Sequence, residues 1–300
     1  MAITQVFAPY LFLPLLVLLP LLVMRHTMIF KIMLAACLLV FSLRFSPHVS
    51  LFPPSAPDAH QQVTVLDWNM EIGHSHDAVL LQLLKAKHPS LVTLQEVDSH
   101  DTFAASTELL RLYPYQLVRP ITQVPANIAL LSSYPILEHG ILKTNDGVWD
   151  EPQAQVLWAR LDLGSAHTLV IVVGHPVSAI NAVPNCYFCS NRRDAQLRSL
   201  NTFVTSFIKR GDAVLLVGDM NVTDREPGYH ELTTGLKDSF TQVGFGSGHS
   251  WGFHRFNPVW PLLRIDYMLA SPRVAPLALD VDCAPRGSDH CVLTGRFGLP

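Results

Sequence analysis

The 300-residue sequence predicts an α/β domain of packed sheets with outer helices, preceded by an apolar segment that forms a transmembrane helical hairpin. Three observations predict this organisation: short β-branched apolar runs outnumber helical segments, residues 1–44 carry almost no charge, and polar motifs recur directly after the apolar runs. We expect residues 1–44 in the membrane, a linker over 45–61 and one folded domain over 62–300. A mean hydropathy of +0.27 with 15% charged residues excludes a disordered chain.

The N-terminal segment has two apolar stretches. Residues 7–24 carry no charge and are about long enough to cross the ~30 Å of hydrocarbon in a bilayer. Their prolines, Pro14 and Pro20, are tolerated in lipid-embedded helices where neighbouring groups satisfy the freed carbonyls. The second stretch, 28–43, carries Lys31 near its start, which can snorkel toward the interface. The sequence therefore predicts two membrane helices.

The basic residues of this segment predict its orientation. Arg25 and Lys31 lie at the turn of the hairpin and should remain cytoplasmic, although Arg44 opposes them. A cleaved signal peptide is disfavoured, because residues 1–24 lack a basic start and a small-residue cleavage pattern. We expect an integral membrane protein that contacts the bilayer through residues 7–43. Its folded domain is then extracytoplasmic, and periplasmic in a bacterium.

Four cysteines of the folded domain bear on its compartment. Cys186 and Cys189 are close in sequence, whereas Cys283 and Cys291 lack the short spacing of a zinc knuckle. Disulfides or free thiols are favoured over a zinc site, and the pairing stays open. A bond within 186–189 would staple the loop that follows His175.

The charge of the folded domain argues against one class of partner. Only three of the 21 basic residues fall in 1–44, but all 24 acidic residues fall in 45–300, which gives that part a net charge of −6. A domain that grips nucleic acid by bulk electrostatics needs a basic face instead. Numerous carboxylates fit a site for a hard divalent cation better.

The folded domain shows both periodicities. Two segments, 77–86 and 193–208, have apolar residues at helical spacing. The predicted buried strands are 63–68, 90–94, 128–131, 156–161, 168–173, 213–217 and 265–269. Strands outnumber helices, which favours packed sheets.

Polar motifs follow the apolar runs, where a packed scaffold presents side chains to one shared cleft. The motif residues are Asp67-Trp68-Asn69, Gln95-Glu96, Gly174-His175-Pro176, Gly218-Asp219-Met220-Asn221, Arg264-Ile265-Asp266-Tyr267 and Gly287-Ser288-Asp289-His290. They offer oxygen donors and two histidines, a set that fits Mg²⁺ with its waters and a substrate phosphate.

Together, V-L-D-W-N-M, L-Q-E-V, V-G-H-P, V-G-D-M-N, R-I-D-Y-M and S-D-H-C, in this order, resemble the endonuclease/exonuclease/phosphatase family of DNase I-like metal-dependent phosphoesterases. The resemblance covers about residues 63–297. It implies a four-layer α/β/β/α sandwich of two packed mixed sheets. It also implies a hydrolase that cleaves a phosphate ester by in-line attack of an activated water, with Mg²⁺ or Mn²⁺ as cofactor. The predicted N-terminal helices would anchor this hydrolase in the membrane.

The resemblance implies a role for each motif residue. Glu96 would be the principal metal ligand, assisted by Asn69 and Asp289. Asp219 would activate the attacking water, and Asn221 would hold the phosphate.

The histidines would complete the site. Asp266 would orient His290, which stabilises charge or transfers a proton, and His175 would act on the opposite side of the phosphate. Arg193, beside Arg192, is a candidate for substrate binding through a phosphate. The substrate, whether nucleic acid, phospholipid headgroup or nucleotide, is not resolved by the sequence.

Each motif alone has a structural explanation, such as a helix cap for Glu96 or an ordinary turn for Gly218–Asn221. Their ordered recurrence favours the site. We interpret Asp67 and Glu71 as structural. Four further residues are expected to lie in loops or in the wall of the cleft: His249, Trp251, His254 and Trp260. A catalytically silent binding or scaffold module on the membrane is the alternative, and the presence of every motif residue argues against it.

Overall fold

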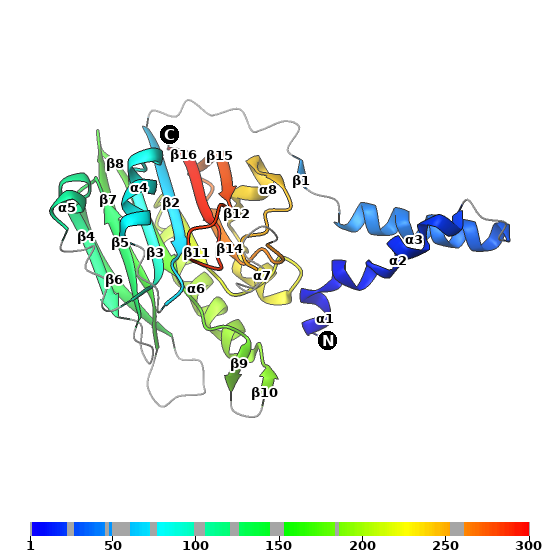
Figure 1. The fold of residues 1–300 in the computed structure, drawn as a ribbon. Coiled ribbons are helices and arrows are strands. Elements are labelled where there is room, and N and C mark those ends of the chain that lie inside the picture. Colours follow the sequence, from blue (N-terminus) through cyan, green and yellow to red (C-terminus); the bar gives the residue numbers. More distant parts are fainter. Residues whose placement is uncertain are drawn as a thin grey trace.

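A computed structural model describes residues 2–22, 27–45, 48–49, 61–72, 77–98, 106–120, 126–144, 153–183, 186–252 and 261–299 (Figure 1). Its centre consists of two six-stranded mixed sheets. The first contains, in spatial order, β15 (Ala275–Asp282), β16 (Val292–Leu299), β2 (Gln61–Asn69), β3 (Leu91–Asp98), β5 (Ala126–Ser132) and β4 (Tyr115–Pro120). The second contains β12 (Lys237–Asp238), β14 (Asp266–Ala270), β11 (Val214–Asp219), β8 (His167–Gly174), β7 (Gln153–Gly164) and β6 (Ile136–Thr144).

The apolar runs explain why these strands are central. In β8 and β11 the side chains from Leu169 to Val173 and from Val214 to Val217 are fully buried, since both faces of this sheet are covered. Inward-facing side chains of both sheets, among them Val65, Leu130, Ile171, Leu215 and Phe297, form one core between the sheets. Two packed mixed sheets are therefore confirmed.

Helices cover the outer faces. In the first sheet, α4 (Asp77–Lys87) and α5 (Thr107–Leu112) pack Leu80, Leu84 and Leu109 against β2, β3 and β5. In the second, α6 (Asn191–Lys209) and α7 (Pro227–Leu232) place Leu197, Leu200 and Leu232 against β8, β11 and β14. The short α8 (Ser239–Val243) adds Phe240 to the edge of the central core. This arrangement is the expected α/β/β/α sandwich.

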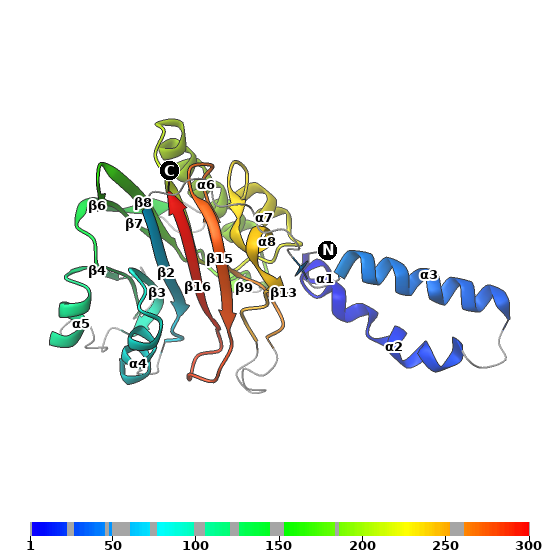
Figure 2. The same ribbon diagram turned by 90° about the horizontal axis from the view of Figure 1, so that it is seen from above.

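The N-terminal segment consists of α1 (Ala2–Val6), η1 (Ala8–Phe12), α2 (Pro14–Leu18), η2 (Leu19–Leu22) and α3 (Met28–Phe45). Its two arms project from the domain in both views, and the rings of Phe12 and Phe41 lie 5.6 Å apart (Figures 1 and 2).

Among the described residues of 1–44, the predicted transmembrane hairpin is not found. None of the helices described in the structure has both the length and the apolar character required to cross a membrane. Proline explains the shortness of the first arm, because Pro9, Pro14 and Pro20 each lie at or near the start of a separate short helix.

Most of the predicted linker, 45–61, lies outside the described residues. Within it, β1 (His48–Val49) pairs antiparallel with β13 (Phe245–Gly246), so the chain returns to the domain after α3. A second small ribbon joins β9 (Ile180–Val183) and β10 (Cys186–Phe188), next to the disulfide Cys186–Cys189. The other disulfide is Cys283–Cys291.

Candidate active site

The predicted site residues meet where strands of the two sheets end. In the first sheet β2 and β3 are parallel, so Asn69 and Glu96 reach the same edge. In the second, β8 and β11 are parallel, which brings His175 and Asp219 to a common edge. Strand β14 runs antiparallel to β11 and begins there, with Asp266 opposite Asp219.

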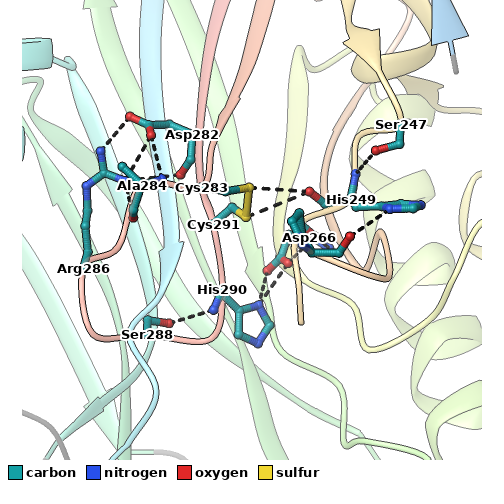
Figure 3. Close-up of a disulfide and its surroundings, with 12 residues drawn as sticks. Ser247, His249, Asp266, Asp282, Cys283, Ala284, Arg286, Ser288, His290 and Cys291 are labelled. Carbon is teal, nitrogen blue, oxygen red and sulfur yellow. Dashed lines mark hydrogen bonds and ion pairs between the residues drawn. A yellow bond between two sulfur atoms is a disulfide. The ribbon is translucent and has the colours of Figure 1, made fainter. Parts of the chain in front are cut away.

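The loop before β16 completes the edge. It carries Asp289 and His290 and is closed by the disulfide Cys283–Cys291 (Figure 3). Ser288 fixes it to the first sheet, since its hydroxyl donates to the Asn69 carbonyl at 2.7 Å. The site is thus assembled from both sheets.

A first group of side chains consists of Asn69, Glu96, His175 and Asp219. Glu96 is its most accessible carboxylate. Its amide-bearing neighbour Asn69 donates from Nδ2 to Glu96 Oε1 at 3.2 Å and to Asp219 Oδ2 at 3.1 Å. His175 Nε2 lies 3.3 Å from Glu96 Oε1 and 3.7 Å from Asp219 Oδ2. Glu96 has a φ of +51° within an irregularity of β3, a conformation that costs energy and re-aims the side chain.

Asp266 and His290 form the second group. His290 Nδ1 lies 3.0 Å from Asp266 Oδ2, which also accepts a hydrogen bond from the Ser250 hydroxyl at 2.5 Å. The other ring nitrogen, Nε2, lies 3.8 Å from Asp219 Oδ2. The imidazoles of His175 and His290 therefore both approach the same carboxylate oxygen, Asp219 Oδ2.

Charge interactions shift the protonation of these groups. Burial favours the neutral form of Glu96, but the hydrogen bond and charge of His175 outweigh it and lower the pKa of Glu96 to about 2. Burial also favours the neutral form of His290, which lowers its pKa. The charge and hydrogen bond of Asp266 outweigh burial and raise the pKa of His290 to about 10. The pKa of His175 is also raised, because Glu96 and Asp219 outweigh its burial.

Asp219 differs from the other carboxylates. Burial and the charge of Asp266 raise the pKa of Asp219 to about 6, against the opposite effect of both histidines. Groups with strongly displaced pKa values that share a cleft are typical of functional sites. Asp219 thus has the protonation behaviour of a general base, and the raised pKa values of both histidines favour their imidazolium forms.

Asn221 is held by its own turn. It has a φ of +50°, and its backbone nitrogen donates to Asp219 Oδ1 at 2.8 Å. Its side-chain Nδ2 donates to the Pro176 carbonyl at 3.0 Å. This fixes the side chain between the two loops that carry His175 and Asp219.

A comparison of the sequence with family models identifies residues 68–290 as a match to the Endonuclease/Exonuclease/phosphatase family. The chain belongs to this family. No curated protein matches the sequence at the threshold applied.

Solved structures agree on the fold of this family member. A TDP2 structure from C. elegans has 18% identity and a TM-score of 0.63, with 81% of this chain and 77% of that chain covered. The 3′-5′ exonuclease NExo from Neisseria meningitidis has 22% identity and a TM-score of 0.62, covering 78% and 99%. An endonuclease/exonuclease/phosphatase from Beutenbergia cavernae has 18% identity and a TM-score of 0.63, covering 80% and 72%.

The donor set of this family member fits a divalent cation. Ligand atoms of Glu96, His175 and Asp219 lie within 4.8 Å of one another. Two carboxylates, with the Glu96 side chain still 28% exposed, suit a hard cation that keeps some of its waters, and the imidazole can join them only in its unprotonated form. A second group, Asp219, Asp266 and His290, is already explained by the Asp266–His290 ion pair.

Asp289, a predicted metal ligand, belongs to neither group among the described residues. Its Oδ2 accepts from Trp251 Nε1 at 2.7 Å, and its Oδ1 lies 3.8 Å from His290 Nε2. Burial raises the pKa of Asp289, and the charges of Glu71 and Glu96 raise it further, against the effects of His290 and Trp251. Asp289 therefore lies at the margin of the site.

The prediction that Arg193 contacts a substrate is wrong. Its side chain is 2% exposed, and its guanidinium donates to Asp194 Oδ1, to Glu226 Oε2 at 2.7 Å and to the Asn221 carbonyl at 2.9 Å. The helical stripe that buries α6 also buries Arg193. Arg193 therefore supports the loop that carries Asn221 through its hydrogen bond to the Asn221 carbonyl.

Three residues outside the predicted site support it. Glu71 has the structural role that was predicted, whereas the roles of Trp251 and Ser250 were missed. Glu71, interpreted as structural, accepts the Asp289 amide at 3.1 Å through Oε2. Trp251, assigned only to the cleft wall, holds the carboxylate of Asp289. Ser250 bonds Asp266 but follows no motif that distinguishes it. The proximity of Glu71 to Asn69 in sequence was the one available signal.

The remaining expectations have simple outcomes. Asp67 is buried between the sheets, where its Oδ1 accepts from Thr93 at 2.6 Å and Gln95 at 2.8 Å. His249 lies beside the Cys283–Cys291 disulfide (Figure 3). His254 and Trp260 lie outside the described residues.

Proposed function

We propose that the protein is a divalent-metal-dependent hydrolase that cleaves a phosphate ester by in-line attack of an activated water. One observation carries this proposal: Asp219 Oδ2 lies 3.7 Å from His175 Nε2 and 3.8 Å from His290 Nε2. A general base thus lies beside two imidazole groups whose pKa values are raised. This is a suitable environment for an anionic, five-coordinate phosphorus in the transition state.

Glu96 is the principal metal ligand in this proposal, with Asn69 and Asp289 beside it. The metal would be Mg²⁺ or Mn²⁺, held by oxygen ligands, because His175 is the proton donor in this proposal and a protonated imidazole cannot be a ligand. When bound, such a cation polarises the phosphoryl group and neutralises charge on its oxygens. Asn69 now presents Nδ2 to Glu96, so oxygen ligation requires its amide to rotate.

The chain's own residues perform the proton transfers. Asp219 accepts a proton from the water as the water oxygen bonds to phosphorus and the ester P–O bond breaks. Asp266 keeps His290 protonated, so that His290 stabilises the phosphoryl oxygens. Asn221 contacts the phosphate, and His175 donates a proton to the departing oxygen on the opposite side.

The substrate class needs a direct test. One structure of the Neisseria NExo enzyme, described as a 3′ phosphatase, is bound to a product DNA hairpin. In this chain Arg193 and Arg264 are both engaged in buried ion pairs, which removes two cations that a polyanion would otherwise contact. Nucleic acids and smaller phosphate esters therefore belong in one panel.

The experiment measures phosphate-ester hydrolysis by the purified full-length chain. The panel contains duplex and single-stranded DNA, a nucleotide, phosphoinositides, sphingomyelin and a generic phosphodiester, each with Mg²⁺, Mn²⁺ or chelator. We expect turnover of one class with metal, a loss of at least about 10²-fold in Glu96→Gln and Asp219→Asn, and none in the exposed control Asp280→Asn. Turnover that survives chelator, or survives both site variants, would refute the proposal.

We also propose that the folded domain works outside the cytoplasm. The two disulfides support this, because disulfides persist mainly in oxidising compartments. Alkylation of intact cells before lysis, followed by mass spectrometry, should find these four cysteines blocked by their bonds. Four alkylated cysteines would place the domain in a reducing compartment.

Contact with a lipid bilayer, predicted through residues 7–43, remains part of the proposal for the portion of that segment beyond Tyr10, because Phe7 and Tyr10 contact the folded domain. Exposed apolar side chains support it, since Val17 and Leu43 are 78% exposed and Met28 and Ile29 are 71% exposed. The full chain should sediment with vesicles, whereas a Val17→Asp/Ile29→Asp variant should sediment less. Equal sedimentation of both proteins would contradict bilayer contact through these residues.

A further inference from the structure

The start of the chain packs against the wall of the candidate active site. Val6, which is 5% exposed, forms a small apolar cluster with Leu263 and Ile265, and Phe7 and Trp251 pack against it. Ile265 immediately precedes Asp266. This cluster joins the first helix of the chain to a segment more than two hundred residues later.

A hydrogen bond fixes the same contact. The Tyr10 hydroxyl donates to the Leu262 carbonyl at 2.6 Å. Leu262 and Leu263 are paired to Trp251 through the backbone, with Leu262 N to Trp251 O at 2.7 Å and Trp251 N to Leu263 O at 3.0 Å. Residues 6–10, the docking turn, therefore hold the strip of chain on which Trp251 is mounted.

Trp251 connects this strip to the site. Its Nε1 donates to Asp289 Oδ2 at 2.7 Å, and its backbone forms an isolated bridge with His290. The next residue, Gly252, donates to the Asp289 carbonyl at 3.2 Å. A continuous set of contacts thus runs from Val6 and Tyr10 to Asp289.

The N-terminal segment is attached to the domain at both of its ends. The docking turn holds its beginning, and the β1·β13 pairing holds the chain after α3. A simple tether needs only its exit attached. Tethering therefore does not explain why residues 6–10 also contact the domain.

We infer that the docking turn is a positioning element of the catalytic site, which acts through Trp251 on Asp289. Trp251 is then a positioning residue and not a catalytic one, since it orients Asp289. The inference rests on the proposed function, because it concerns the same site. Outer-shell partners of metal ligands commonly change metal affinity or activity by about 10- to 100-fold when removed.

The test compares four variants of the full chain. Trp251→Phe keeps the ring but removes the donor to Asp289, Tyr10→Phe removes only the bond to Leu262, and Val6→Ser weakens the apolar cluster. Leu137→Ala, an exposed apolar position on β6 of the folded domain, is the matched control. The readouts are the Mn²⁺ dissociation constant by calorimetry, kcat and KM for the substrate found in the panel, and thermal stability.

We expect Trp251→Phe to weaken Mn²⁺ binding by about 10- to 100-fold. Tyr10→Phe and Val6→Ser should change it in the same direction by several-fold, with no change in Leu137→Ala. Adding Val6→Ser to Trp251→Phe should have little further effect, because the two act on one pathway. Such non-additivity separates positioning from general destabilisation.

Two results would overturn the inference. Unchanged Mn²⁺ affinity in Trp251→Phe would remove Trp251 from the site, and fully additive effects would make the docking turn merely a structural contact. The calorimetry does not depend on turnover. If no substrate is hydrolysed but Mn²⁺ binding responds as described, the hydrolase proposal fails and the positioning role stands.

Discussion

His290 Nδ1 lies 3.0 Å from Asp266 Oδ2, and both side chains are almost fully buried. The contact holds the imidazole ring with Nε2 directed toward Asp219. A histidine held in this way has one ring nitrogen committed to its orienting carboxylate and the other available to the reaction.

Asp266→Asn should displace the alkaline limb of the pH–rate profile. The charge and hydrogen bond of Asp266 outweigh burial and raise the pKa of His290 to about 10, so the imidazolium persists well above neutrality. Without that charge the pKa falls, and the cation is lost at lower pH. We expect kcat at pH 8 to fall by about 10²- to 10⁴-fold, with the limb moved to lower pH. An unchanged limb would show that His290 does not act as a cation.

Wild-type stability should depend on pH through the same pair. The folded pKa of His290 exceeds its ordinary value of 6.5, so this contribution is fully present below about pH 6.5 and is lost as pH rises to about 10. Urea denaturation across this range should show declining stability in the wild type. The decline should be smaller in Asp266→Asn, and equal slopes would contradict the ion pair.

Asp219 should set the acid limb. Burial and the charge of Asp266 raise its pKa to about 6, and a base must be deprotonated to accept a proton. We expect kcat/KM to fall about tenfold per pH unit below the limb. A bound cation favours the carboxylate, so the limb should lie at or below pH 6 and move lower as Mg²⁺ is raised. A limb above pH 7 would assign it to another group.

Arg193→Met should unfold the protein more easily. It leaves Glu226, whose side chain is 2% exposed, without its cation, and loss of one partner of a buried pair costs about 3–5 kcal/mol. The matched control is Arg198→Met, because the Arg198–Glu231 pair is exposed and such pairs contribute about 0–1 kcal/mol. Denaturant melts should separate the two variants. Equal stability would mean that the buried network contributes little.

Replacing both Cys283 and Cys291 with serine should reduce stability and activity together. The bond joins residues separated by eight positions, and closure of a loop this short contributes about 2–3 kcal/mol. The same loop carries Asp289 and His290, so turnover should fall even below the melting temperature. The double serine variant at Cys186 and Cys189 is the comparison, and we expect it to retain more turnover.

The sequence predicts the central strands well and the peripheral ones poorly. All seven apolar runs correspond to strands and both helical stripes to α4 and α6, because complete burial leaves a strong pattern. Of the strands in the two large sheets, β4, β6, β12, β15 and β16 were not predicted. Residues such as Leu137 in β6 and Arg296 in β16 are exposed, so these strands mix apolar and polar positions with no clear run.

The site shows the same division. Motif residues on strand ends converge because strand direction fixes where each one lies, as with Asn69 and Asp219. Arg193 was misplaced because a charge on a helix gives no sign of burial by Asp194 and Glu226. Contacts that depend on loop conformation, such as Trp251 to Asp289, follow no spacing rule.

The site is divided between the sheets: Asn69, Glu96 and His290 come from one, and His175, Asp219 and Asp266 from the other. Neither half contains both the base and the principal ligand. Turnover can therefore arise only after the two sheets have docked, so the return of activity during refolding would date that docking event. The spectroscopic signal of secondary structure should recover earlier than activity, because each sheet can form its strands alone.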